Sequence, residues 1–232
     1  MTCERCRDLG SLMTPDGRAA IACGCRWPRP PHEVAAISRI PERYLGCDLE
    51  RFRAGTPTQA AARDAAVRFA ASYPKVPAGL LFAGPTGTGK THLAVAILAA
   101  VVAVGSRGTF VNGTELCDRL QATYSARWTG ESADEVIAPY RNCDLLVFDE
   151  LGGRRPTDYV RDVLYGLINY RYNRMLPIVA TTNFLGSDLE TRIGSPVRSR
   201  LAEMCQQVTV FGPDHRRGKG KGVACQTMMT LG

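Results

Sequence analysis

The sequence lacks a hydrophobic run long enough to cross a membrane as a helix. Its longest uninterrupted apolar run, Leu93–Val104, has twelve residues, whereas a membrane-spanning helix needs about 20. The first 30 residues contain cysteines, arginines and prolines where a secretory signal has its apolar segment. We therefore expect a cytoplasmic protein with no membrane partner.

Strong compositional bias is also absent. Hydrophobic residues make up 45% of the 232 residues and charged residues 22%, which excludes collagen-like, low-complexity and wholly disordered chains. The 3 histidines are isolated from one another, and we expect His92, which follows the phosphate loop, to pack and not to bind metal. The formal net charge of +7 is compatible with a nucleic-acid or helicase partner but does not by itself indicate one.

Changes in composition along the chain predict four segments. We expect a cysteine-rich module at residues 1–31, a linker at 32–56, a regular α/β domain at 57–217 and a flexible tail at 218–232. The proline-rich stretch that ends at Pro31 separates the first two segments.

Short apolar strands alternate with longer helices inside the α/β domain. This alternation is typical of a parallel sheet covered by helices on both faces, a three-layer arrangement. Thr58, Thr114 and Ser195 are the expected caps of three helices. The expected strands are 79–83, 109–111, 145–148 and 178–181, and the expected helices are 58–73, 91–104, 114–127 and 159–174.

The residues that follow the first expected strand match the phosphate-loop pattern G-x-x-x-x-G-K-[ST]. The glycines allow a tight turn whose N–H groups, with the helix N-terminus, point at phosphate oxygens. We expect Lys90 to contact the β- and γ-phosphates of ATP and the Thr91 hydroxyl to bind Mg²⁺. The predicted nucleotide-binding residues are Gly84, Pro85, Thr86, Gly87, Thr88, Gly89, Lys90 and Thr91.

Two acids end the third expected strand, at the sheet edge where open α/β sheets bind ligands. We expect Asp149 to hold Mg²⁺ and Glu150 to orient and deprotonate the attacking water. Asn183 follows the next strand, where its amide could orient the water or contact the γ-phosphate; an ordinary turn asparagine is the alternative.

These motifs, together with Thr181–Asn183 and Gly194–Leu201, resemble the AAA+ ATPases of the bacterial helicase-loader group (DnaC/DnaI-like). The insertion-sequence transposition helpers (IstB-like) are close relatives of that group. The resemblance runs from about Pro41 to Arg217. It implies a P-loop AAA+ domain with a five-stranded parallel sheet, ATP bound between neighbouring subunits, and a C-terminal lid that is reduced or absent.

The resemblance also assigns arginines to the ATP site. In the family's pattern, an arginine just before a leucine reaches the ATP of the next subunit, which implies that Arg200 is the arginine finger, with Arg198 second and a solvated basic helix as the alternative. A second sensor, which contacts ATP within the same subunit, falls on Arg216 by spacing, and Arg217 stays open.

Four cysteines near the start of the chain form two close pairs, Cys3 with Cys6 and Cys23 with Cys25. Two such pairs brought together supply the four thiolates of a tetrahedral Zn²⁺ site, which a module of this size needs in order to fold. Iron–sulfur ligation and four unrelated cysteines are the alternatives. Similar modules occur in the helicase loaders that the chain resembles.

We therefore predict an ATPase that binds the replicative DNA helicase through its zinc module and places it on single-stranded DNA, with ATP as the switch. Hydrolysis should be stimulated by DNA, because Arg200 acts only on a neighbour. The stretch that contains Arg119, Tyr124, Arg127 and Trp128 is suited to stacking with DNA but equally to packing. The alternatives are a transposition helper, a small-molecule kinase and a zinc adaptor without a working nucleotide site.

Overall fold

The computed structural model describes residues 11–13, 20–22, 31–124 and 130–216. Its central feature is a five-stranded sheet in the order β4-β5-β6-β3-β7, in which all neighbouring strands run parallel. The strands are β3 (Gly79–Ala83), β4 (Gly108–Asn112), β5 (Leu145–Asp149), β6 (Ile178–Thr182) and β7 (Cys205–Thr209). The predicted α/β class and five-stranded parallel sheet are confirmed.

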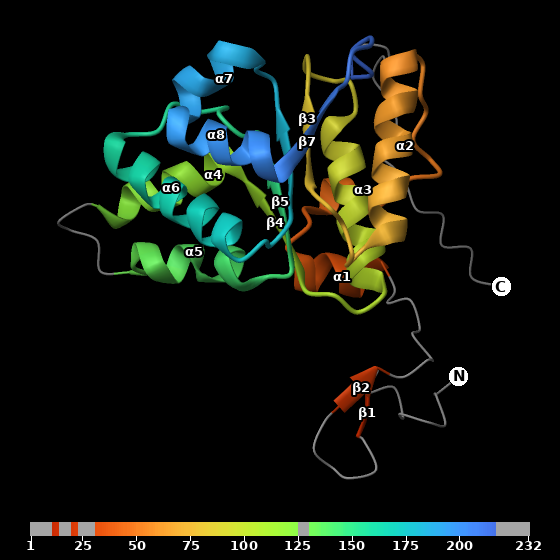
Figure 1. Ribbon diagram of the computed structural model, residues 1–232, viewed down its shortest axis with the longest axis horizontal. Coiled ribbons are helices and arrows are strands. Elements are labelled where there is room, and N and C mark those ends of the chain that lie inside the picture. The colour runs from red at the N-terminus through yellow and green to blue at the C-terminus, as the bar shows by residue number, and fades with distance from the viewer. Residues whose placement is uncertain (1–10, 14–19, 23–30, 125–129, 217–232) are drawn as a thin grey trace.

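Helices cover both faces of this sheet, as Figure 1 shows. One face carries α1 (Pro31–Ser38), α2 (Pro57–Ser72) and α3 (Lys90–Ala103), and the short helix η1 (Glu42–Tyr44) precedes α2. The other face carries α4 (Gly113–Thr123), α5 (Ala133–Asn142), α6 (Asp158–Asn173), α7 (Gly186–Ile193) and α8 (Ser195–Met204).

Side chains of each strand alternate between the two hydrophobic cores that result. On β3, Leu80 and Phe82 pack into the core under α1, α2 and α3, whereas Leu81 packs into the core under α4 to α8. All five residues of β3, β5 and β6 are buried, as expected for inner strands of a parallel sheet with two covered faces. Burial on both faces explains why these strands are apolar, apart from Asp149 at the end of β5 and the threonines at the end of β6.

A separate antiparallel pair, β1 (Ser11–Met13) with β2 (Ala20–Ala22), lies in the expected cysteine-rich module. Cys3, Cys6, Cys23 and Cys25 lie outside the described residues, and so does the expected tail at 218–232. None of the helices in the described ranges combines the length and hydropathy that a bilayer span requires.

Helix starts differ from the sequence prediction by one or two residues. Thr56 caps α2 instead of Thr58, Asn112 caps α4 instead of Thr114, and Gly194 precedes α8 with Ser195 as its first residue. In each helix the observed cap lies before the expected one. The expected helix 114–127 is described as α4 up to Thr123, and α5 was not foreseen.

A buried arginine joins three segments at the end of the sheet opposite the strand carboxyl ends. The Arg171 side chain, on α6, is fully buried and donates to the carbonyl oxygens of Tyr140 (2.9 Å), Cys143 (2.9 Å) and Pro177 (2.8 Å). Burial lowers the pKa of Arg171. Because these carbonyls lie at the end of α5 and before β5 and β6, Arg171 fixes where both inner strands begin.

We expect Arg171→Met to lower the free energy of unfolding by about 3 kcal/mol, because several buried carbonyl groups lose their donor. Denaturant unfolding monitored by circular dichroism measures this change. Arg68→Met, at an exposed position on α2, is the control and should change stability by no more than about 0.5 kcal/mol. Equal effects of the two substitutions would contradict the structural role of Arg171.

Candidate nucleotide-binding site

The phosphate loop connects β3 to α3, and its glycines adopt backbone conformations that other residues rarely reach. Gly87 has φ 78° and Gly89 has φ 98°. Space is also lacking, because a Cβ on Gly89 would lie 2.5 Å from the Phe52 ring and one on Gly87 would collide with the Asp214 carboxylate. Both positions therefore require glycine, and the Phe52 ring and the Asp214 carboxylate lie close against the loop.

Lys90 folds back over this loop and is buried, with 6% of its surface exposed. Its Nζ donates to the carbonyl oxygens of Gly84 at 2.8 Å and Pro85 at 2.6 Å. Burial, together with the nearby charge of Arg216, lowers the pKa of Lys90 to about 8, although Asp149 and Glu150 act in the opposite direction. An anion that binds beside Lys90 would restore its charged form.

Asp149, at the end of β5, accepts hydrogen bonds from two hydroxyl groups. Thr91 Oγ1 donates at 2.9 Å and Thr181 Oγ1 at 2.6 Å, both to Asp149 Oδ1. Burial raises the pKa of Asp149, while these hydrogen bonds lower it. A carboxylate and a hydroxyl group side by side are oxygen donors that suit Mg²⁺, which keeps several of its water ligands. The described residues contain no group of three or more His, Cys, Asp or Glu side chains arranged to hold a metal.

Glu150 follows Asp149 with φ 58°, in the left-handed region. Its backbone N–H donates to Thr181 Oγ1 at 3.0 Å, and its carboxylate accepts from Asn112 Nδ2 at 3.3 Å. The Oδ1 atom of the same Asn112 caps α4 by accepting from two backbone N–H groups. Our sequence interpretation missed Asn112, although a polar residue between a strand and a helix is a signal for a cap.

Asn183 is half-buried and directly follows β6. Since β6 lies between β5 and β3, its end lies between Asp149 and the phosphate loop. The parallel sheet thus brings together three of the predicted motifs: the phosphate loop, the Asp149–Glu150 pair and Thr181–Asn183. A direct role for Asn183 on water or phosphate stays a prediction.

The segment after β7 lies against the phosphate loop. The backbone N–H of His215 donates to Gly87 O at 3.1 Å, and the backbone N–H of Arg216 donates to Asp214 Oδ1 at 2.9 Å. Gln59, a buried residue of α2 that the sequence did not indicate, donates to Thr88 O at 3.1 Å. These contacts bring Arg216 close to the phosphate loop, where its charge acts on Lys90. Its role as the second sensor stays a prediction, and Arg217 lies outside the described residues.

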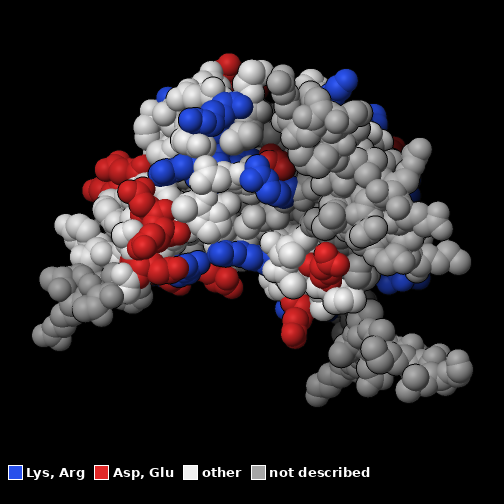
Figure 2. Space-filling model, turned by 90° about the horizontal axis from the view of Figure 1, so that it is seen from below, with Lys and Arg blue, Asp and Glu red and all other residues white. Residues whose placement is uncertain are grey.

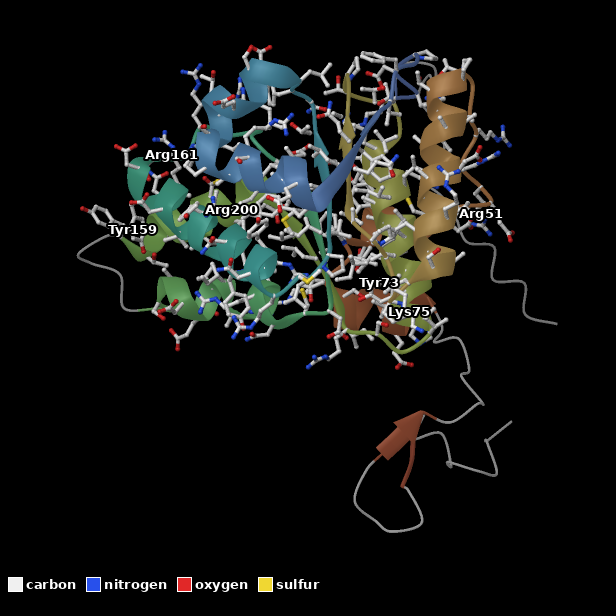
Figure 3. All side chains as sticks on the ribbon, in the orientation of Figure 1. Arg51, Tyr73, Lys75, Tyr159, Arg161 and Arg200 are labelled. Atoms are coloured by element: carbon white, nitrogen blue, oxygen red, sulfur yellow. The ribbon has the colours of Figure 1, made fainter. Side chains whose placement is uncertain are left out.

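Arg200 lies apart from these residues, on α8. Figure 3 shows its side chain between α8 and α6. Its hydrogen bonds go to Asn169, Tyr165 and Pro196, all within these two helices. Arg198 bonds instead to Gln207 at 3.3 Å. The structure therefore does not bring Arg200 to the phosphate loop of its own chain.

A glycine-rich loop between a buried strand and a helix, with acids at the end of a neighbouring strand, defines a P-loop nucleotide-binding protein. More specifically, the chain belongs to the family described as IstB-like ATP binding protein, whose model matches residues 45–218. The resemblance predicted from the motifs is confirmed.

Similar proteins include helicase loaders. The replicative helicase loader DnaC of Escherichia coli K12 is 24% identical over 185 residues, which are 80% of this chain and 75% of that protein. A crystal structure of the DnaC helicase loader is 30% identical with a TM-score of 0.65 and covers 74% of this chain and 100% of its own. The crystal structure of DnaI has a TM-score of 0.67 at 22% identity, over 79% of this chain and 100% of its own, and shows the shared fold.

We expect the affinity for ATP to fall as pH rises, because the triphosphate binds the charged form of Lys90, whose pKa without ligand is about 8. Most of Lys90 is charged at pH 7 and little of it at pH 9, so affinity should drop about 10-fold between these values. Titration with a fluorescent ATP analogue at both pH values measures the drop, and calorimetry in two buffers at pH 9 should detect proton uptake. Affinity that is independent of pH would contradict the assignment.

We expect Lys90→Ala to abolish ATP binding, because it removes the cation at the phosphates. Glu150→Gln should keep binding but lower turnover by about 10²–10⁴-fold, the usual contribution of a general base. Binding and phosphate release are measured separately. Glu190→Gln, at an exposed position on α7, is the matched control for the loss of a carboxylate. Unchanged turnover in Glu150→Gln would disprove its role as the base.

Proposed function

We propose that this chain is an ATP-dependent loader that binds the replicative DNA helicase and helps to place it on single-stranded DNA. This proposal rests on the arrangement of the nucleotide-site residues in a chain that is homologous to the DnaC helicase loader over 80% of its length. Lys90, Thr91, Asp149 and Glu150 lie at one sheet edge, and each is the residue type that phosphoryl transfer requires.

The chemistry that we propose is hydrolysis of ATP to ADP and phosphate. Glu150 takes a proton from a water molecule, whose oxygen attacks the γ-phosphorus as the bond to the β–γ bridging oxygen breaks. Lys90 and the backbone N–H groups of the loop stabilise the charge on the phosphate oxygens. Mg²⁺ held by Thr91 and Asp149 would neutralise further phosphate charge. Arg200 of a neighbouring protomer would complete the site, which makes hydrolysis depend on self-association.

Two features support contact with single-stranded DNA. The rings of Tyr124 and Tyr159 are 4.9 Å apart, and Tyr124 is 73% exposed, so an aromatic surface is available for base stacking. Tyr124 directly follows α4, whose first turn is capped by Asn112, the residue that holds Glu150. A change in α4 on DNA binding could thus reach the catalytic base, which supports DNA-stimulated hydrolysis.

The basic residues near Tyr124 and Tyr159 give less support to contact with single-stranded DNA. Arg119, in the stretch that is equally suited to DNA stacking and to packing, pairs with Glu131 at 2.6 Å, and Arg127 and Trp128 lie outside the described residues. Figure 2, a view of the underside, shows basic side chains in separate patches beside a group of acidic ones, without a continuous basic surface on the described part of that face. We therefore base the DNA proposal on Tyr124 and Tyr159.

The zinc module remains part of the proposal as the segment that docks on the helicase. In the sequence, one cysteine pair precedes β1 and the other follows β2. Because Ser11, the first residue of β1, pairs with Ala22, the last residue of β2, the chain enters and leaves this hairpin at the same end. Such a hairpin is compatible with one Cys₄ site formed by Cys3, Cys6, Cys23 and Cys25.

A transposition helper is the second candidate, because the family that contains this chain is described as IstB-like. The two candidates share the nucleotide site and differ in their partner. The cysteine module favours the loader, since the resemblance that we drew from the sequence links such modules to helicase loaders.

We expect the purified chain to bind the replicative helicase from the same source and to increase, in the presence of ATP, the amount of helicase on single-stranded DNA coated with its binding protein. Lys90→Ala should remove the increase, because the ATP switch is lost, whereas Glu190→Gln should keep it. Helicase unwinding and co-sedimentation measure the outcome. Absence of helicase binding, with binding to a transposase instead, would favour the second candidate.

A further inference from the structure

The side chain of Arg200 is held in one position by three residues of α6. Arg200 Nε donates to Asn169 Oδ1 at 2.8 Å, and Nη2 donates to the Tyr165 hydroxyl at 2.8 Å. The guanidinium also lies over the rings of Tyr165 and Tyr172, at 4.7 and 5.6 Å from their centroids. These α6 residues have the spacing i, i+4 and i+7, so they share one helix face. We refer to Tyr165, Asn169 and Tyr172 as the α6 cradle.

All hydrogen-bond acceptors in this arrangement are neutral. They are a phenol, an amide and, at 3.1 Å from Nη1, the carbonyl oxygen of Pro196. Several other arginines of the described chain, such as Arg107 and Arg119, pair with carboxylates, whereas Arg171 and Arg198 also bind neutral acceptors. Among the described residues no carboxylate forms an ion pair with Arg200, so its positive charge is not neutralised.

Glu203 would be the natural ion-pair partner, since it lies three residues after Arg200 on the same helix. Its carboxylate instead accepts a hydrogen bond from the Tyr172 hydroxyl at 2.7 Å. The same tyrosine places its ring beside the guanidinium. Tyr172 thus binds the Glu203 carboxylate through its hydroxyl group while its ring lies beside Arg200.

A guanidinium has five N–H groups, and three of them are used within the chain. Two N–H groups and a full positive charge are left for an anion that another molecule presents. An arginine held in this way loses little rotamer entropy when it binds, because its side chain is already ordered.

We propose that the α6 cradle positions Arg200 and keeps its charge available for the ATP triphosphate of a neighbouring protomer, with Tyr165 and Asn169 as positioning residues. This inference rests on the proposed function, in which Arg200 completes a neighbour's site. It adds that the finger is prepared within its own chain before the neighbour arrives. A cradle that served only to pack α8 on α6 would not need acceptors that leave the charge intact.

Asn169→Asp tests the proposal most directly, because it changes almost no volume, keeps an acceptor for Nε and neutralises the guanidinium. We expect kcat for MgATP, measured on full-length protein assembled on single-stranded DNA, to fall about 10-fold, with KM and the melting temperature maintained. Asn169→Ala should lower kcat to a similar extent because Arg200 loses its orientation. Tyr170→Phe, on the same helix but without contact to Arg200, is the control and should match the wild type.

Arg200→Ala separates this proposal from the proposed function. If Arg200→Ala turns over ATP like the wild type, the finger itself is wrong and both proposals fail. If Arg200→Ala loses turnover while Asn169→Asp and Asn169→Ala keep it, only the cradle is overturned. A lower melting temperature of Asn169→Ala with normal turnover would show that the cradle merely packs α8 on α6.

Discussion

One hydroxyl group, that of Thr181, connects the parts of the nucleotide site. It donates to Asp149 and accepts from the backbone N–H of Glu150, while Asp149 accepts in turn from Thr91 at the start of α3. These three hydrogen bonds set the phosphate-loop helix, the Asp149 carboxylate and the backbone of Glu150 relative to one another. The parallel order β5-β6-β3 makes this possible, because it brings the carboxyl ends of three strands to one edge.

Two buried cations, Arg171 and Lys90, have different roles in this domain. Arg171 is surrounded by backbone carbonyls and closes the opposite end of the sheet, where it has a structural role. Lys90 donates to two carbonyls of its own loop, and burial lowers its pKa to about 8. A bound phosphate would therefore stabilise the charged form of Lys90, because the anion compensates for the hydration that burial removes.

The inner strands and the catalytic motifs could be predicted because their signals are local. A continuous apolar run that ends in Asp149 and Glu150 is readable without knowledge of its neighbours. β7 has weaker signals, since Gln206 and Gln207 are exposed on this edge strand, and the residues alone did not indicate it. The helix caps were placed one or two residues late because neighbouring Thr, Ser, Asn and Gly residues all suit the N-cap position, and only the backbone path selects among them.

The sequence by itself determined the class of the protein, the phosphate loop and the acids that belong with it, because glycine spacing and strand ends depend on neighbours along the chain. Only the tertiary structure decided which distant side chains meet. Asn112 reaches Glu150, Gln59 reaches the phosphate loop and the α6 cradle holds Arg200, in each case across elements far apart in sequence. Such contacts depend on strand order and helix packing, which residue spacing does not encode.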